Sequence, residues 1–255
     1  MNVIIITGAS SGIGQEFALQ MDAGFKNIDE FWLVARREDK LCETAELLDH
    51  RTRIFPIDIT DSVQLDILEK AVKAENAVVR ILVNCAGFGK TGSFAGQDRT
   101  AVLGMIRLNC MALTEMTHRM IPYMRRNSRI IQMASAAAFL PQPDFAVYAA
   151  GKSYVLSFSR ALYRELKPLG IWVTCVCPGP VDTPFLDIAG NRTDTPVIKR
   201  LVTVGAKKVV GRALRDSCFR REMSVYGIPV RALYLISGAV PHKIILMLMS
   251  LMKKG

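Results

Sequence analysis

Short runs of apolar residues alternate with longer amphipathic segments along most of this 255-residue chain. This alternation is typical of strand–helix–strand units around a parallel sheet, and it constrains the fold more than any other feature. The expected strands are Val3–Thr7, Phe31–Ala35, Arg53–Ile57, Ile81–Asn84, Arg129–Ala134, Trp172–Cys177 and Ser224–Tyr226. Helices are expected near residues 12–24, 38–49, 61–76, 97–127 and 147–167. We therefore predict an α/β fold, doubly wound, with a seven-stranded parallel sheet flanked by helices.

Half of the residues are apolar, which is enough to bury the core of one domain. No linker divides the chain before residue 178, so we expect one domain over residues 1–227 and an apolar, basic helical extension over 228–255. The first residues run into a strand without a charged leader or a cleavable apolar segment, which favours a cytoplasmic protein.

The six cysteines include no Cys-x-x-Cys pair, so we expect reduced, mostly buried thiols and no metal site. Cys175 and Cys177 lie within one expected strand, and we predict their side chains on opposite faces of it.

The formal net charge of +10 comes entirely from residues 199–255, which hold twelve Lys/Arg and two Asp/Glu. This region ends in an apolar run over residues 244–252 that is too short for a standard membrane span. A basic segment beside an apolar one suits peripheral contact with an anionic membrane surface. The alternative is a solvated basic face, with the helix docked on its own domain or on a second subunit. We expect no nucleic-acid partner, since the basic and apolar residues are not interleaved.

A glycine-rich turn, Thr7–Gly14, separates the first expected strand from the first expected helix. Glycines let such a backbone turn tightly and approach a pyrophosphate held at the helix N-terminus. The turn predicts a dinucleotide site of Rossmann type, although packing of strand against helix is the alternative explanation. Its candidate cofactor-binding residues are Gly8, Ser10, Ser11, Gly12, Ile13 and Gly14.

The second expected strand ends at Ala35, followed by Arg36 and Arg37. A site that prefers NAD places an acidic residue about 20 residues beyond the glycines, to hold the ribose diol. A small residue before two guanidinium groups instead suits the 2′-phosphate of NADP, so we favour NADP(H) over NAD(H). Pairing of the arginines with Glu38 and Asp39 is the alternative, and it keeps NAD open.

Tyr148 and Lys152 lie four residues apart in an expected helix, and Ser135 follows the fifth expected strand. The spacing places phenol and amine on one helix face, where the ammonium can lower the pKa of the phenol toward neutrality. Such a phenol can exchange a proton with a reacting carbonyl. Tyr163 and Lys167 repeat the spacing further along, so the spacing alone does not identify a catalytic pair.

Together these segments resemble the short-chain dehydrogenase/reductase family over about residues 2–185. The resemblance rests on matches in the family's order: Thr7–Gly14, Asn84–Gly87, Asn109, Ser135, Tyr148, Lys152 and Pro178–Gly179. Cys85 departs from the pattern, since the family usually has a second Asn at this position.

The resemblance implies a role for each catalytic candidate. Ser135 would hold a substrate oxygen, Tyr148 would exchange a proton with it, and Lys152 would bind ribose hydroxyls and tune Tyr148. Asn109 would kink its helix and hold a water in a relay to Lys152. The further cofactor contacts implied are Asp58, Ile59, Asn84, Ala86, Gly87, Pro178, Gly179, Val181 and Thr183.

The expected activity is NADP(H)-dependent interconversion of a ketone and a secondary alcohol by hydride transfer. The long apolar extension resembles the steroid- and ketoacyl-reductase branch, which favours a bulky lipophilic substrate. The apolar residues expected to flank the site are Phe88, Phe94, Phe139, Leu140, Phe185, Leu186 and Ile188. A small polar or sugar-type ketone is one alternative, and a non-catalytic NADP-binding sensor or scaffold is another. The family implies a homodimer or homotetramer, unless the extension covers the surface that pairs.

Overall fold

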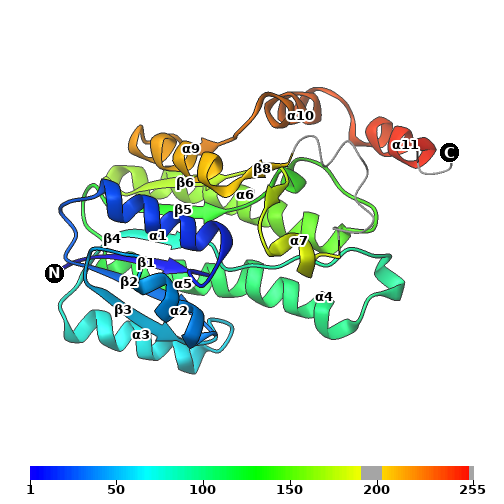
Figure 1. Ribbon diagram of the computed structural model, residues 1–255. Coiled ribbons are helices and arrows are strands. Elements are labelled where there is room, and N and C mark those ends of the chain that lie inside the picture. Colours follow the sequence, from blue (N-terminus) through cyan, green and yellow to red (C-terminus); the bar gives the residue numbers. More distant parts are fainter. Residues whose placement is uncertain (191–202, 253–255) are drawn as a thin grey trace.

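The central sheet has seven parallel strands in the order β3-β2-β1-β4-β5-β6-β9, in a computed structural model that describes residues 1–190 and 203–252 (Figure 1). The strands are β1 (Asn2–Thr7), β2 (Glu30–Ala35), β3 (Thr52–Pro56), β4 (Val78–Asn84), β5 (Arg129–Met133), β6 (Trp172–Val176) and β9 (Met223–Ser224). The predicted doubly wound α/β fold is confirmed. The strand order reverses between β1 and β4, which marks the place where such sheets bind ligands.

Helices cover both faces of this sheet. The α-helices are α1 (Gly12–Gly24), α2 (Glu38–Ala45), α3 (Ser62–Ala74), α4 (Arg99–Ile106), α5 (Leu113–Met120), α6 (Ala146–Leu166), α7 (Phe185–Ile188), α9 (Ala206–Cys218), α10 (Ile228–Ala239) and α11 (His242–Met252). Shorter elements are the 3₁₀ turns η1 (Phe94–Gly96), η3 (Ile121–Tyr123), η4 (Ala136–Phe139) and η5 (Lys167–Leu169), and the π-helix η2 (Arg107–Ala112). Two further strands, β7 (Val181–Asp182) and β8 (Val204–Gly205), pair with each other outside the main sheet.

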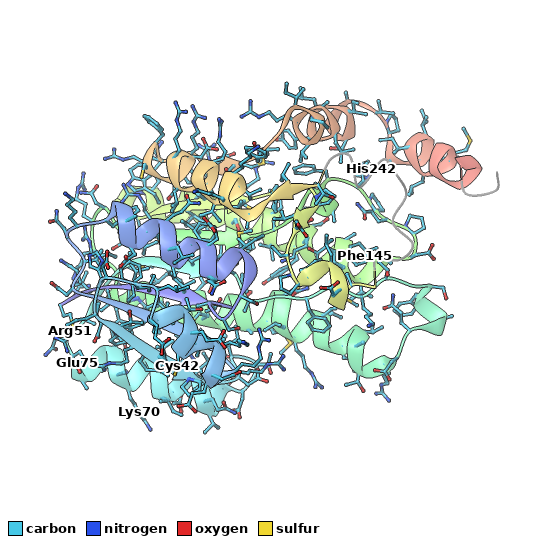
Figure 2. The ribbon with its side chains drawn as sticks, viewed as in Figure 1. Cys42, Arg51, Lys70, Glu75, Phe145 and His242 are labelled. Atoms are coloured by element: carbon cyan, nitrogen blue, oxygen red, sulfur yellow. The ribbon has the colours of Figure 1, made fainter. Side chains whose placement is uncertain are left out.

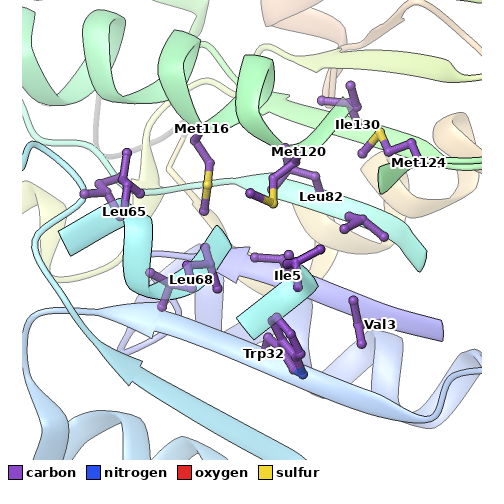
Figure 3. Close-up of a cluster of buried hydrophobic side chains, with 14 of the residues drawn as sticks. Val3, Ile5, Trp32, Leu65, Leu68, Leu82, Met116, Met120, Met124 and Ile130 are labelled. Carbon is purple, nitrogen blue, oxygen red and sulfur yellow. The ribbon is translucent and has the colours of Figure 1, made fainter. Parts of the chain in front are cut away.

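The apolar run of β1 is buried on both faces of the sheet. Val3 and Ile5 pack with Trp32 against α3, α5 and α6 (Figure 3). Ile4 and Ile6 point the other way and pack against α1, α2 and α9. Alternate residues of a strand face opposite sides, so a continuous apolar run is what a central parallel strand requires.

The long helix expected over residues 97–127 is interrupted near its middle. α4 ends at Ile106, the π-helix η2 follows, and α5 begins only at Leu113. A π-helical turn carries an extra residue, and such turns are frequent at functional sites. Asn109 is buried within η2, with 1% of its surface exposed.

The prediction that Cys175 and Cys177 lie on opposite faces is wrong. Residues two apart in a strand share a face, and these two Sγ atoms are 3.9 Å apart in a buried cluster. All six cysteines are free thiols, but only Cys175 and Cys177 are buried while Cys42 and Cys218 are exposed, so the expectation of mostly buried thiols is wrong.

Candidate active site

A cleft of about 1160 Å³ opens at the carboxyl ends of the strands, where the sheet order reverses. The segments that follow β1 to β6 line it, together with residues of α4, α7 and α10. Open parallel sheets bind ligands at this position, because the loops after the strands leave a crevice there.

The glycine-rich turn after β1 forms one wall of the cleft. Gly8 has φ +68°, and a Cβ there would lie 2.8 Å from the backbone nitrogen of Ala86. A Cβ on Gly14 would collide with the Gly8 carbonyl oxygen. The turn leads into α1 at Gly12, whose first amide groups have no partner within the helix. Bare backbone at a helix N-terminus fits the pyrophosphate of a dinucleotide.

Arg36 and Arg37 both reach the cleft from the end of β2. Arg37 donates from Nη2 to the hydroxyls of Ser10 and Ser11, over 3.3 Å in each case. Arg36 Nη1 lies 3.9 Å from Asp58 Oδ2, and its side chain is 75% exposed. Within residues 1–190 and 203–252, neither arginine forms an ion pair with the two acids that begin α2. The Arg37 guanidinium is therefore held against the glycine-rich turn.

Asp58 and Ile59 line the cleft after β3. Asp58 Oδ1 accepts hydrogen bonds from the backbone nitrogen and the hydroxyl of Thr60, at 2.9 and 2.8 Å. Ile59 is buried, with 6% of its surface exposed. The carboxylate of Asp58 thus fixes its own loop as well as facing Arg36.

Ser135, Tyr148 and Lys152 converge in the same cleft. Ser135 ends the loop from β5 and is hydrogen-bonded to Tyr148, while Tyr148 and Lys152 lie on one buried face of α6. Tyr148 and Lys152 are 6% and 5% exposed. Lys152 Nζ donates to the Met133 carbonyl at 2.7 Å and lies 5.6 Å from the centre of the Tyr148 ring.

Burial controls the protonation of this group. It raises the pKa of Tyr148 to about 12, and the hydrogen bond with Ser135 opposes this rise only in part. Burial also lowers the pKa of Lys152. The prediction of a lowered phenol pKa is wrong for this structure, because burial of the phenol dominates its pKa, and the Lys152 amine donates to the Met133 carbonyl. At neutral pH the phenol is therefore protonated and able to donate its proton.

Comparison with known proteins decides the family. Residues 2–192 match the family described as short chain dehydrogenase. This chain is a member of the short-chain dehydrogenase family. An uncharacterised oxidoreductase of Staphylococcus epidermidis is 32% identical over 187 residues, which cover 72% of this chain and 80% of that protein. The predicted assignment to an oxidoreductase family is confirmed.

Two further similarities bear on the site. The very-long-chain 3-oxoacyl-CoA reductase of Phaeosphaeria nodorum is 30% identical over 215 residues, 80% of this chain and 62% of that one. A short-chain dehydrogenase from Sphingobium yanoikuyae, solved with NADPH, superposes with a TM-score of 0.79 at 27% identity, over 98% and 96% of the two chains. A Burkholderia phymatum structure solved with NAD has the same TM-score at 22% identity, over 92% of each chain, and shows the shared fold.

In this short-chain dehydrogenase, Asn84 lies behind the cleft lining rather than in it. Its Nδ2 donates to Thr117 Oγ1 at 2.9 Å and to Gln132 Oε1 at 3.0 Å, in the interior between β4, β5 and α5. Its side chain therefore does not reach the cleft surface, where the predicted contact with a cofactor would be made. The sequence pattern, a polar residue at a strand end, does not show whether the side chain faces the cleft or the interior.

Asn109 also lies behind the lining, where it holds the loop after β4. Its Oδ1 accepts from the Phe88 nitrogen at 3.0 Å, and its Nδ2 donates to the Phe88 carbonyl at 2.8 Å. A Cβ on Gly87 would lie 2.8 Å from Asn109 Oδ1 and 3.5 Å from Lys152 Nζ. Asn109 is thus a positioning residue for the backbone beside Lys152.

The other predicted contacts line the cleft of this short-chain dehydrogenase. They are Ile13, Ala86, Gly87, Pro178, Gly179, Val181 and Thr183. Of the seven apolar residues expected around the substrate, Phe88, Phe185 and Leu186 line the cleft. Phe139 and Leu140 are instead buried in the protein, and Phe94 is 66% exposed on its surface. The side chain of Ile188 lies outside the described residues.

Sequence reasoning missed Phe145 and Leu233. Phe145 stacks on Tyr148 with 4.3 Å between ring centroids, and it lies on the side of the molecule that carries α7 and α11 (Figure 2). The sequence feature that could have identified Phe145 is its place three residues before Tyr148, at the start of α6. Leu233 reaches the cleft from α10, and a contact so distant along the chain leaves no local pattern.

Proposed function

We propose that this short-chain dehydrogenase interconverts a ketone and a secondary alcohol with NADP(H). The observation that supports this most is the convergence of Ser135, Tyr148 and Lys152 beside a glycine-rich turn that fits a dinucleotide. A bound nicotinamide cofactor would supply the hydride, and the protein would supply placement and the proton.

Tyr148 transfers that proton. Its phenol is protonated at neutral pH, because burial raises its pKa to about 12, so Oη can donate to the carbonyl oxygen of a ketone. Ser135 Oγ accepts from the Ala137 nitrogen at 3.1 Å, and its own hydrogen, which serves the Tyr148 phenol in the free protein, would turn to the same substrate oxygen. Lys152, close to the Tyr148 ring, stabilises the phenolate that remains after transfer.

We propose NADP(H) as the preferred cofactor because Arg37 is held at the glycine-rich turn and Ala35 leaves no carboxylate for a ribose diol. The Sphingobium structure contains NADPH and the Burkholderia phymatum structure contains NAD, which supports a nicotinamide cofactor for this chain. A hydrogen bond to a charged group contributes about 1.5–3 kcal/mol. Arg37→Ala should therefore raise the KM for NADPH by about ten- to a hundredfold and leave the KM for NADH unchanged.

The matched control for Arg37→Ala is Lys40→Ala, which removes a positive charge three residues further on, in α2, but one that pairs with Glu43. It should leave the KM values for both cofactors near those of the wild type. Equal KM changes for NADPH and NADH in Arg37→Ala would contradict the proposed contact with the 2′-phosphate.

We propose an apolar ketone of steroid or acyl type as substrate. Apolar side chains line the cleft, namely Phe88, Phe145, Phe185, Leu186 and Leu233, and the three phenylalanines pack with Tyr148. The similarity to a very-long-chain 3-oxoacyl-CoA reductase supports the same class. A pocket of this kind gains affinity from each apolar group that it removes from water.

A ketone screen with the wild-type protein tests the reaction. Oxidation of NADPH is followed by absorbance with ketones that range from small sugar-type compounds to 3-oxoacyl thioesters and steroids. We expect turnover of the large apolar ketones, at KM values well below those for the small polar ones. Binding of NADPH without oxidation across the panel would contradict the reaction, and a preference for sugar-type ketones would contradict the substrate class.

We also propose that residues 1–227 form the catalytic domain, that 228–255 extend it, and that the protein works in the cytoplasm as a homodimer or homotetramer. Among the described residues, no helix combines the length and the apolar character needed to cross a bilayer.

A further inference from the structure

Helix α10 carries apolar side chains on two opposite sides. On the inner side, Leu233 lines the cleft and the Tyr234 ring lies 5.0 Å from the Phe139 ring. Val230 packs there too, since a Cβ on Gly179 would lie 2.9 Å from its Cγ2. The outer side is an exposed stripe at helical spacing, formed by Ile228, Ala232, Leu235, Ile236 and Ala239.

This outer stripe is unusually open to solvent. Ile228, Leu235 and Ile236 are 82%, 68% and 50% exposed. A surface helix normally keeps one apolar side inward and a polar side outward, and a helix that is apolar all round is normally covered all round. The next helix continues the exposed apolar surface, since Ile244 of α11 is 45% exposed. Some partner outside the described structure would be needed to cover this stripe.

Basic side chains lie on the same two helices as the outer stripe. They are Arg231 on α10 and Lys243 on α11, both exposed, and neither forms an ion pair within residues 1–190 and 203–252. Lys207 and Lys208 are also exposed, but they begin α9, which packs on α1. The helices α9, α10 and α11 lie along one edge of the molecule (Figure 1). This edge therefore combines apolar side chains with uncompensated positive charge.

The acids in this region do not offset that charge. After residue 198 the chain holds only Asp216 and Glu222. Asp216 is buried and pairs with Arg212 and Arg221, at 2.7 and 2.9 Å. Glu222 pairs with arginines of α6. The carboxylates are thus already engaged with other arginines.

We propose that the outer stripe of α10, together with α11, docks on the surface of an anionic lipid bilayer. The apolar side chains would enter the interface, and Arg231 and Lys243 would meet the negative headgroups. A second copy of this chain fits the stripe less well. A two-fold contact brings the same surface of both copies together, and here it would place two positive edges against each other.

Docking in this orientation would place the cleft beside the bilayer. The inner side of α10 is part of the cleft wall through Leu233, so the helix that touches lipid also borders the site. An apolar ketone could then pass from the bilayer to Tyr148 without crossing bulk water. This consequence rests on the proposed function, whereas the docking itself does not.

Co-sedimentation of the full chain with vesicles tests the docking without any turnover. We expect the wild type to sediment with vesicles that contain phosphatidylglycerol and to stay in solution with phosphatidylcholine alone, and we expect added salt to weaken binding. The double variant Leu235→Glu/Ile236→Glu should bind the anionic vesicles at least about tenfold less well. Arg231→Glu/Lys243→Glu should weaken binding mainly at low salt.

The control is Val63→Glu/Ile67→Glu, which places the same two charges on exposed apolar positions of α3, 73% and 53% exposed in the wild type. It should bind vesicles like the wild type, and all variants should keep the wild-type circular dichroism and melting temperature. Absence of wild-type binding, equal binding to both lipids, or equal loss in the α3 control would overturn the proposal. If the wild type does not bind vesicles, and only Leu235→Glu/Ile236→Glu forms a smaller species in solution than the wild type, the stripe is an interface between copies instead. Failure of the ketone screen would leave the vesicle result unaffected, so the two proposals are separable.

Discussion

The two ends of α6 carry the same pair of side chains in different surroundings. At the amino end, Tyr148 is 6% exposed, is hydrogen-bonded to Ser135 and faces the cleft. Near the carboxyl end, Tyr163 donates from its hydroxyl to the Arg220 carbonyl at 3.1 Å, outside the cleft. Lys167, its partner by spacing, is exposed in the 3₁₀ turn η5 beyond the end of α6.

The difference shows what turns a spacing into a candidate site. A strand end supplies Ser135 to the first pair, and burial removes water from Tyr148 and Lys152. The second pair has neither, and Pro168 follows Lys167 where the helix stops. The spacing brings phenol and amine together, but the parallel sheet decides which pair meets a third group and a ligand cleft.

The largest expected effect separates the two tyrosines by rate. Tyr148→Phe should lower kcat for ketone reduction by about 10²–10⁴-fold, because the substrate oxygen loses its proton donor. Tyr163→Phe is the matched control and should keep most of the wild-type rate. Steady-state kinetics with NADPH and a working ketone measure both variants. Similar rates for the two variants would remove the basis for assigning different roles to the two ends of α6.

Most of the fold could be predicted from periodicity and glycine placement. Helix α1 spans 12–24 as expected, because a glycine-rich turn marks its start and an apolar stripe marks its length. The resemblance implied a kink at Asn109, but the π-helical form of η2 could not be predicted, since one extra residue per turn disturbs the apolar period too little to read. The two-residue strands β7 and β8 are too short to leave a pattern.

The candidate residues that the structure brings together are those whose place follows from the backbone. The glycine-rich turn, Ser135 and the α6 pair line the cleft because strand ends of a parallel sheet meet at one edge. Burial could not be read from the sequence, so the direction of the Tyr148 pKa shift was wrong and Asn84 was expected in the cleft. Both errors concern how side chains are desolvated, which depends on residues distant along the chain.

A smaller effect concerns the dependence of stability on pH at the amino end of α6. The pKa of Tyr148 is about 12 in the folded protein against an ordinary value of 10.0, so folding favours the protonated phenol. Its stabilising contribution is therefore fully present below about pH 10 and is lost as the pH rises toward 12, by roughly 3 kcal/mol. Urea unfolding of wild type and Tyr148→Phe across this pH range measures the difference in their free energies of unfolding. The titration of Lys152 and of other groups that both proteins share cancels in this difference. A constant difference in the free energy of unfolding would contradict the desolvated phenol.

The smallest expected effect concerns Tyr163, near the other end of α6, and it is an effect on stability rather than on rate. Tyr163→Phe removes the hydrogen bond to the Arg220 carbonyl, which ties α6 to the loop after α9, and should lower the free energy of unfolding by about 1 kcal/mol. Its ring should still pack on Trp172, 6.0 Å away between centroids, so the loss stays small. Urea unfolding at neutral pH measures it. Loss of the Tyr148 hydroxyl would then lower the rate, and loss of the Tyr163 hydroxyl would lower the stability. A Tyr163→Phe variant with a lower rate and unchanged stability would mean that this hydroxyl acts on the cleft through α6 rather than on the fold.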